Sequence, residues 1–156
     1  MMLKRTNSQD PDFLSLVTLL DEYLAQVDGD EHAYYAQFNG VDQIPNVVVA
    51  YEGYIAIGCG AIKRHDDQTA EIKRMFVRPE SRGRRTGRLI LEELESWARE
   101  LGYTEAILET GHKQIAAVRL YSGSGYNVIP NYDQYAGVEN SVCMKKRITL
   151  DEDAAV

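Results

Sequence analysis

A predicted strand, an arginine- and glycine-rich loop and an amphipathic helix follow one another between residues 69 and 102, and this succession constrains the fold most. Alternation in TAEIKRMFV predicts a strand with Ile72, Arg74 and Phe76 on one face and Glu71, Lys73, Met75 and Val77 on the other. The apolar stripe that predicts the helix after the loop consists of Ile90, Leu94, Trp97, Ala98 and Leu101, and Gly102 is the expected C-cap.

Further strands and helices are predicted along the rest of the chain. Asp10 and Pro11 are typical of a helix start, and residues 30–38 indicate a second, short helix. Strands are expected at 3–7, 46–51, 54–64, 104–110, 126–132 and 140–148, and a further helix runs from residue 113 to Gly123 or Gly125. Hairpins combined with strand–helix–strand units predict a mixed sheet with helices packed on it, which is an α/β (α+β) fold.

Composition limits the classes of protein to consider. The 156 residues fit one domain, which we expect over residues 1–150, with a frayed tail at 151–156. The chain lacks a membrane-length apolar run and a secretory signal, so we expect a cytoplasmic protein without a membrane partner. Cys59 and Cys143 are expected to be buried thiols, and no Cys/His spacing predicts a metal site. The net charge of -7 argues against nucleic-acid binding and permits cationic substrates.

The loop concentrates positive charge within this acidic chain. Its charged and flexible residues are Arg78, Arg82, Arg84, Arg85, Arg88, Gly83 and Gly87. Because the first turn of a helix has unpaired N–H groups and a positive dipole end, the loop predicts a pyrophosphate-type ligand at the helix N-terminus. The P-loop and the dinucleotide-binding fingerprints are both absent. A solvated basic loop is the alternative interpretation.

Two segments resemble the GNAT superfamily of N-acetyltransferases. RGRRTG, Arg82 to Gly87, is similar to the signature Arg/Gln-x-x-Gly-x-Gly/Ala at a strand-to-helix junction, but Arg85 stands at the middle glycine position. QIAAVRLYSGSGY is similar to the family's later helix, written Asn-x-x-Ala-x-x-x-Tyr-x-x-x-Gly-Phe. It carries Gln114 at the Asn position and Tyr121 at the Tyr position. The two segments occur in the family's order, which makes the resemblance more specific than either segment alone.

The resemblance implies the GNAT-like acyl-CoA N-acyltransferase fold, whose mixed and mostly antiparallel sheet has six or seven strands and about four flanking helices. It also implies acetyl-CoA as co-substrate and no metal. In this fold the fourth and fifth strands splay apart, and the pantetheine arm enters the gap. The residues implied to bind the coenzyme are Phe76, Val77, Arg82, Gly83, Arg84, Arg85, Thr86, Gly87, Arg88 and Gln114.

The implied activity is transfer of an acetyl group to a primary amine by direct attack in a ternary complex. Tyr121 is the implied acid for the departing thiolate, and a packed helix tyrosine is the alternative. Glu71 is the candidate base, and a carboxylate paired with Lys73 is the alternative. His32 and water are further base candidates. A main-chain N–H between Met75 and Val77 is the expected oxyanion donor.

The acceptor is less constrained than the donor. The acidic N-terminal half favours a cationic small-molecule or peptide amine, although a solvated acidic surface explains the same charges. Tyr34, Tyr35, Tyr132 and Tyr135 are expected to flank the acceptor mouth or to cover the sheet. A non-catalytic acyl-CoA-binding or regulatory module is the alternative function. The resemblance also suggests a homodimer.

Overall fold

The computed structural model describes residues 1–29 and 43–149 of the chain. The strands are β1 (Met2–Thr6), β2 (Asn46–Glu52), β3 (Ile55–Arg64), β4 (Thr69–Val77), β5 (Glu105–Gly111), β6 (Asn127–Ile129) and β7 (Ser141–Arg147). The α-helices are α1 (Pro11–Asp28), α3 (Thr86–Glu100) and α4 (Ile115–Gly123), and two short 3-10 helices are η2 (Pro79–Ser81) and η3 (Asp133–Tyr135). The short helix expected at 30–38, and with it His32, Tyr34 and Tyr35, lies outside the described residues.

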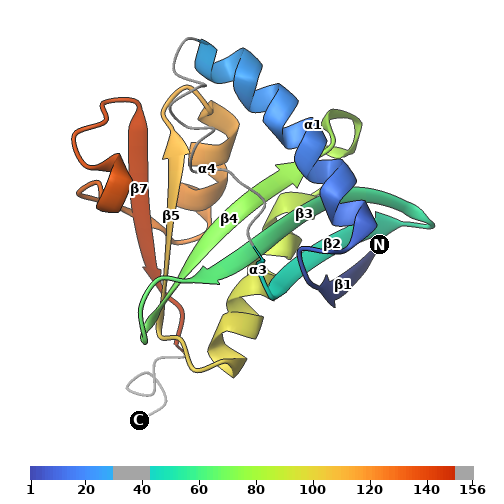
Figure 1. Cartoon of the computed structure of the whole chain (residues 1–156), viewed down its shortest axis with the longest axis horizontal. Helices are drawn as coiled ribbons and strands as arrows, with labels where there is room; N and C mark the ends of the chain where they lie inside the picture. The colour runs from blue at the N-terminus through green and yellow to red at the C-terminus, as the bar shows by residue number, and fades with distance from the viewer. Residues whose placement is uncertain (30–42, 150–156) are drawn as a thin grey trace.

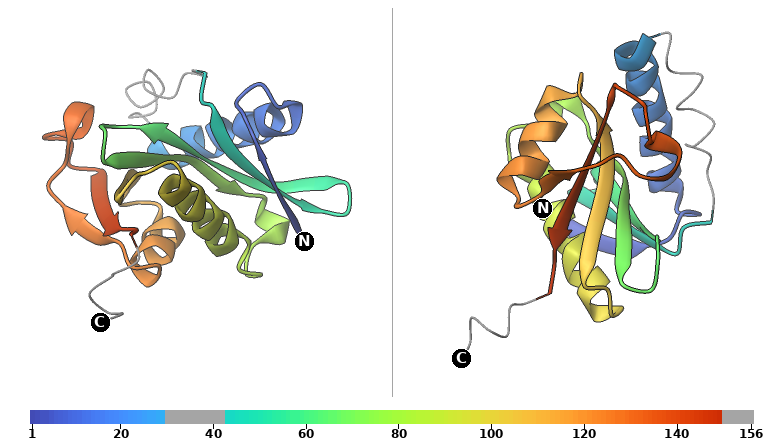
Figure 2. Two further views of the ribbon diagram at one scale, coloured as in Figure 1. Left: turned by 90° about the horizontal axis from the view of Figure 1, so that it is seen from below. Right: turned by 90° about the vertical axis from the view of Figure 1, so that its left-hand side faces the viewer.

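One seven-stranded sheet runs through the molecule in the order β1-β2-β3-β4-β5-β7-β6 (Figure 1). Its neighbouring strands are antiparallel except β4 and β5, which are parallel. Helix α1 covers one face, whereas α3 and α4 cover the other (Figure 2). The predicted fold class is confirmed, with three α-helices in the described chain.

Two apolar cores hold these layers together. Residues of α1 pack with β2 and β3 on one face, where Phe13 and Leu16 are almost fully buried. On the other face α3 contributes Ile90 and Leu94 to a core that also contains Tyr121 of α4. The predicted stripe of α3 is therefore confirmed at these positions. Leu101 is an exception, because it is the C-cap residue and half exposed.

Strands β4 and β5 separate after a short parallel contact. Their pairing covers Thr69–Glu105, Ala70–Ala106 and Glu71–Ile107, and beyond it the two strands diverge (Figure 1). In the described chain, β4 has no hydrogen-bonded neighbour on its β5 side after Glu71. The splay expected from the family resemblance is present, and it opens the sheet in the middle.

A β-bulge in β4 corrects the predicted assignment of its faces. The register with β3 shifts between Cys59 and Ala61, and Arg74 adopts a left-handed conformation with φ of 61°. Ile72 consequently packs in the α3 core, while Phe76 packs in the α1 core. The prediction that both point the same way was wrong, because strict alternation does not survive an extra residue in a strand.

In the described chain, no helix combines the length and apolar character needed to cross a bilayer.

Candidate active site

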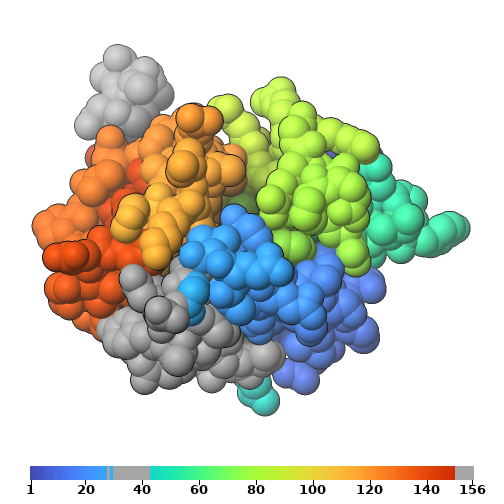
Figure 3. All heavy atoms as spheres, turned by 90° about the horizontal axis from the view of Figure 1, so that it is seen from above, coloured from blue at the N-terminus to red at the C-terminus, as the bar shows by residue number. Residues whose placement is uncertain are grey.

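The arginine loop and the N-terminus of α3 form one side of a cleft. All of the predicted coenzyme-binding residues except Arg84 line it, namely Phe76, Val77, Arg82, Gly83, Arg85, Thr86, Gly87, Arg88 and Gln114. Tyr121 of α4 and Tyr23 of α1 lie in the same lining. Figure 3 shows the corresponding hollow between the loop, α1 and α4. We call it the arginine-loop cleft.

The loop reaches α3 through residues with unusual backbone angles. Gly83 has φ of 81°, and Arg85 is the N-cap of α3 with φ of 64° and ψ of 12°. This left-handed conformation is the one a glycine adopts without strain, so Arg85 takes the conformation expected of a glycine at this motif position. The departure from the motif therefore leaves the helix start in place.

Gly87 lets the loop approach α4 closely. A Cβ at this position would lie 3.3 Å from Cδ2 of Leu120 and 3.7 Å from Cγ2 of Val77. The first turn of α3 therefore stays near the cleft wall with its main-chain N–H groups, which suit an anion. Exposed arginine side chains at 85 and 88 border the same place. The residues present fit a diphosphate.

The loop arginines have different partners. Arg82 donates from Nε to the carbonyl of Val77 at 3.0 Å, and its guanidinium lies 5.3 Å from the ring centre of Tyr23. Arg84 instead pairs with Glu52 at 3.1 Å and is absent from the cleft lining. Arg82 thus connects the loop to α1, whereas the structure does not bring the Arg84 side chain to the site.

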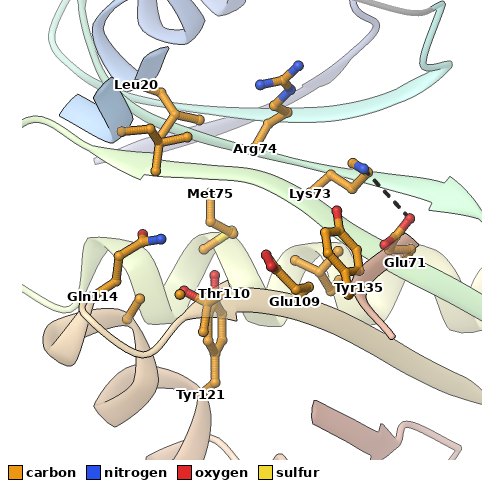
Figure 4. A pocket seen from close by; sticks show the side chains of 14 residues that line it. Leu20, Glu71, Lys73, Arg74, Met75, Glu109, Thr110, Gln114, Tyr121 and Tyr135 are labelled. Carbon is orange, nitrogen blue, oxygen red and sulfur yellow. Dashed lines mark ion pairs between the residues drawn. The ribbon is translucent and has the colours of Figure 1, made fainter. Parts of the chain in front are cut away.

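A polar chamber adjoins the cleft where β4 and β5 separate (Figure 4). Its lining consists of Leu20, Leu24, Glu71, Ile72, Lys73, Arg74, Met75, Glu109, Thr110, Gly111, Gln114, Ala117, Tyr121 and Tyr135. Leu20, Met75, Gln114, Ala117 and Tyr121 line both spaces. The cleft and the polar chamber are therefore continuous, and Tyr121 stands at their junction.

Tyr121 is the buried phenol at that junction. Its side chain points into the gap between β4 and β5 (Figure 4) and the residue is 6% exposed. Burial raises the pKa of Tyr121, and the charge of Glu109 raises it further. The phenol is consequently neutral at physiological pH, and a neutral phenol can donate a proton.

Glu71 is held at the other end of the chamber. The hydroxyl of Tyr132 donates to its Oε2 at 2.8 Å, and Nζ of Lys73 lies 3.8 Å from its Oε1. Burial raises the pKa of Tyr132, with the charge of Glu71 adding to the effect, so this phenol stays a donor. Tyr132 lies in the segment before η3, so this segment borders the chamber at Glu71.

Glu109 is a chamber residue that the sequence analysis missed. It lies on β5 and accepts a 2.9 Å hydrogen bond from Oγ of Ser141. Its charge also contributes to the raised pKa of Tyr135, after burial. The sequence does offer a reason to consider Glu109. It lies near the end of the strand that leads into the motif helix, and the splayed sheet exposes side chains there.

Other candidate groups lie away from this chemistry. Burial raises the pKa of Cys59 to about 12, and Cys143 is also buried, so neither thiol has the character of a nucleophile. His65 lies 3.5 Å from Asp133, and Nδ1 of His112 lies 3.2 Å from the carbonyl oxygen of Asn140. Within residues 1–29 and 43–149, no group of three or more His, Cys, Asp or Glu is arranged to hold a metal.

Comparisons with known proteins identify the family. The sequence model of the acetyltransferase (GNAT) family matches residues 13–126. The chain belongs to this family. The family match spans most of α1, the arginine loop and α4. It contains the whole cleft lining and all of the chamber lining except Tyr135 of η3.

Individual members of the family agree with this assignment. An IAA acetyltransferase of Azospirillum brasilense is 32% identical over 136 residues, which is 85% of this chain and 88% of that protein. The crystal structure of a candidate acyl-CoA N-acyltransferase from Klebsiella pneumoniae superposes with a TM-score of 0.80 and 27% identity, covering 95% of this chain and 97% of that one. A GNAT family acetyltransferase from Elizabethkingia anophelis was solved with acetyl-CoA bound. It superposes with a TM-score of 0.66 and 15% identity, covering 94% of this chain and 97% of that one.

Proposed function

We propose that the chain is an N-acetyltransferase that moves an acetyl group from acetyl-CoA to a primary amine by direct attack. One observation carries the proposal. The splay of β4 and β5 joins the arginine-loop cleft to the polar chamber, with Tyr121 in both linings. A donor on one side and an acceptor on the other meet at that junction without a covalent enzyme intermediate.

The coenzyme diphosphate binds at the first turn of α3. Main-chain N–H groups there and the guanidinium groups of Arg85 and Arg88 provide charge-assisted contacts. The pantetheine arm follows the open side of β4 at Phe76 and Val77, and Gln114 hydrogen-bonds it from the N-terminus of α4. The acetyl-CoA held by the Elizabethkingia protein supports this ligand for the shared fold.

The thioester supplies an activated acetyl carbon, and the chain's residues supply proton transfer and charge stabilisation. A main-chain N–H between Met75 and Val77 stabilises the oxyanion. Tyr121 donates its proton to the departing sulfur, which its raised pKa permits because the phenol stays protonated. Glu71 accepts the proton lost by the amine, directly or through water.

Thiol release tests the activity. Purified protein is incubated with acetyl-CoA and a panel of primary amines, and free thiol is followed together with mass detection of the acetylated amine. We expect amine-dependent thiol release and coenzyme binding by calorimetry. A non-catalytic acyl-CoA-binding module would instead bind the coenzyme without release, and absence of binding would reject both functions.

The single domain over residues 1–150, a cytoplasmic location and a homodimer stay predictions. Light scattering over a range of concentrations measures the oligomeric state.

A further inference from the structure

The polar chamber carries charges of both signs. Glu71 and Glu109 contribute carboxylates, and Lys73 contributes an ammonium close to Glu71 (Figure 4). Arg74 also lines the chamber, although its guanidinium lies 3.4 Å from Asp21 of α1. The described wall is therefore not the uniformly acidic surface that a polyamine prefers.

Lys73 is nearly buried and makes no hydrogen bond through its side chain to the described residues. Its side chain is 13% exposed, and its one ionic contact in the described chain is the 3.8 Å approach to Glu71. That separation exceeds the length of a hydrogen bond, so the described residues leave all three ammonium donors unfilled. A buried charge is costly unless it is both paired and hydrogen-bonded. An anionic group brought by the substrate would supply the missing acceptors.

The bulge in β4 keeps Lys73 on the chamber side of the sheet. Lys73 lies opposite Ala61, and Phe76 lies opposite Cys59. Ala61, Cys59 and Phe76 all belong to the α1 core, so Lys73 shares that face. The strained residue Arg74 follows immediately. A locally strained backbone that directs a poorly paired ammonium into a chamber suggests a role in binding.

Glu71 makes no hydrogen bond to Lys73, because its Oε1 lies 3.8 Å from Nζ. Tyr132 occupies Oε2 of Glu71 at 2.8 Å and holds the carboxylate in place. In Figure 4, Glu109 lies between Tyr121 and the Glu71–Lys73 pair. An acceptor in the chamber therefore meets a carboxylate near the phenol and an ammonium farther from it.

We infer that the acceptor carries a carboxylate as well as its amino group, as amino acids do. The carboxylate binds Lys73, while the amino group lies on the Glu109 side, next to Tyr121 and the cleft, and passes its proton to Glu71 through water. This assignment rests on the proposed function. It replaces the cationic acceptor expected from the acidic N-terminal half with a zwitterionic one, and it makes Lys73 the specificity-determining residue.

Matched substrate pairs test the inference. Each of several amino acids is compared with its decarboxylated amine, for example phenylalanine with phenethylamine and lysine with cadaverine, using thiol release. A hydrogen-bonded charge pair predicts a preference of at least about tenfold in kcat/KM for the amino acid. Lys73→Met should reduce this preference to about twofold or less. The readout is the ratio of the two kcat/KM values, because Lys73 also contacts Glu71 and its loss changes the rate with both members of a pair.

The matched control is Lys145→Met, which removes an ammonium of the same sheet that pairs with Glu105 outside the chamber. It should keep the wild-type preference. A second readout is independent of turnover. Calorimetry compares N-acetylphenylalanine with N-acetylphenethylamine in the presence of coenzyme A, and wild type but not Lys73→Met should favour the acid.

Three outcomes would overturn the inference. Equal or better turnover of the decarboxylated amines by wild type removes the need for an anionic group. Retention of the preference in Lys73→Met removes Lys73 as its cause. Coenzyme binding without thiol release from any amine rejects the proposed function as well, which distinguishes that failure from the first two.

Discussion

The hydroxyl of Tyr132 donates a 2.8 Å hydrogen bond to Oε2 of Glu71, across 61 positions of sequence. The contact ties the segment before η3 to the first part of β4, at the point where β4 and β5 stop pairing. Lys73 approaches the other carboxylate oxygen. Glu71 therefore has a fixed orientation in the chamber wall, which is what a proton acceptor of the proposed reaction requires.

Removing the Glu71 carboxylate and removing the Tyr132 hydroxyl that supports it should lower kcat by different factors. Glu71→Gln should lower kcat by about 10²-fold or more, because general base catalysis typically contributes that much. Tyr132→Phe should lower kcat by a smaller factor of about 3–10, since it removes one hydrogen bond and keeps the base. Neither change should alter coenzyme affinity by calorimetry. A kcat near the wild-type value in Glu71→Gln would assign the role of base to water or another group.

Tyr121→Phe should lower kcat by about 10²-fold and leave the coenzyme Kd unchanged, because the ring still packs in the α3 core. Burial raises the pKa of Tyr121 above the ordinary value of 10.0, so ionisation of this phenol should not reduce the wild-type rate below pH 10.0. Tyr54→Phe is the control, since Tyr54 is fully exposed at the β2–β3 turn. A large loss of coenzyme affinity in Tyr121→Phe would contradict the acid role.

The positions of the helices and strands were predicted from the sequence more accurately than the face of the sheet on which each strand residue lies. Asp10, Pro11 and the apolar spacing of α3 are local signals, and the structure confirms both helices. The bulge in β4 has no such signal, because Arg74 is not a residue that usually marks a left-handed position. Its effect reaches the site, since it places Lys73 and Phe76 on the same face.

The two halves of the site were predictable to different degrees. Loop residues 82 to 88 lie close together in the chain, so a motif could predict the side of the cleft that the loop forms. The polar chamber instead combines Glu71, Glu109 and Tyr135 from three distant elements. Contacts of that kind depend on the sheet order, in which β5 lies between β4 and β7, and no local pattern encodes it. Residues 30–42, where His32 falls, lie outside the described chain.

Arg85→Gly should stabilise the protein. A non-glycine residue in the left-handed region costs about 1–2 kcal/mol, and the added chain entropy of glycine offsets roughly half of that, so we expect a gain of about 0.5–1 kcal/mol. Chemical denaturation at equilibrium measures it. Arg84→Gly is the matched control, because Arg84 has no positive φ and pairs with Glu52. This control should be destabilised. Coenzyme affinity should fall modestly in Arg85→Gly, as one cleft guanidinium is lost.

Asp10→Ala should destabilise α1 in a pH-dependent way. Asp10 is the N-cap, and its carboxylate accepts hydrogen bonds from the main-chain N–H groups of Asp12 and Phe13 and pairs with Lys4. Losing such a cap costs about 0.5–2 kcal/mol at pH 7. Burial acts to raise the pKa of Asp10, but Lys4 and the helix N–H groups outweigh it and lower the pKa below 3.8.

A carboxyl group with a lowered pKa stabilises the folded state above its unfolded pKa, and the contribution disappears as the pH falls through the folded pKa. The difference in unfolding free energy between wild type and Asp10→Ala should therefore be constant near neutrality and shrink below pH 3.8. Urea titrations at several pH values measure it. Asp10→Asn keeps a capping oxygen without the charge, so it should lose less than Asp10→Ala and vary less with pH. A difference that grows on acidification would contradict the charged cap.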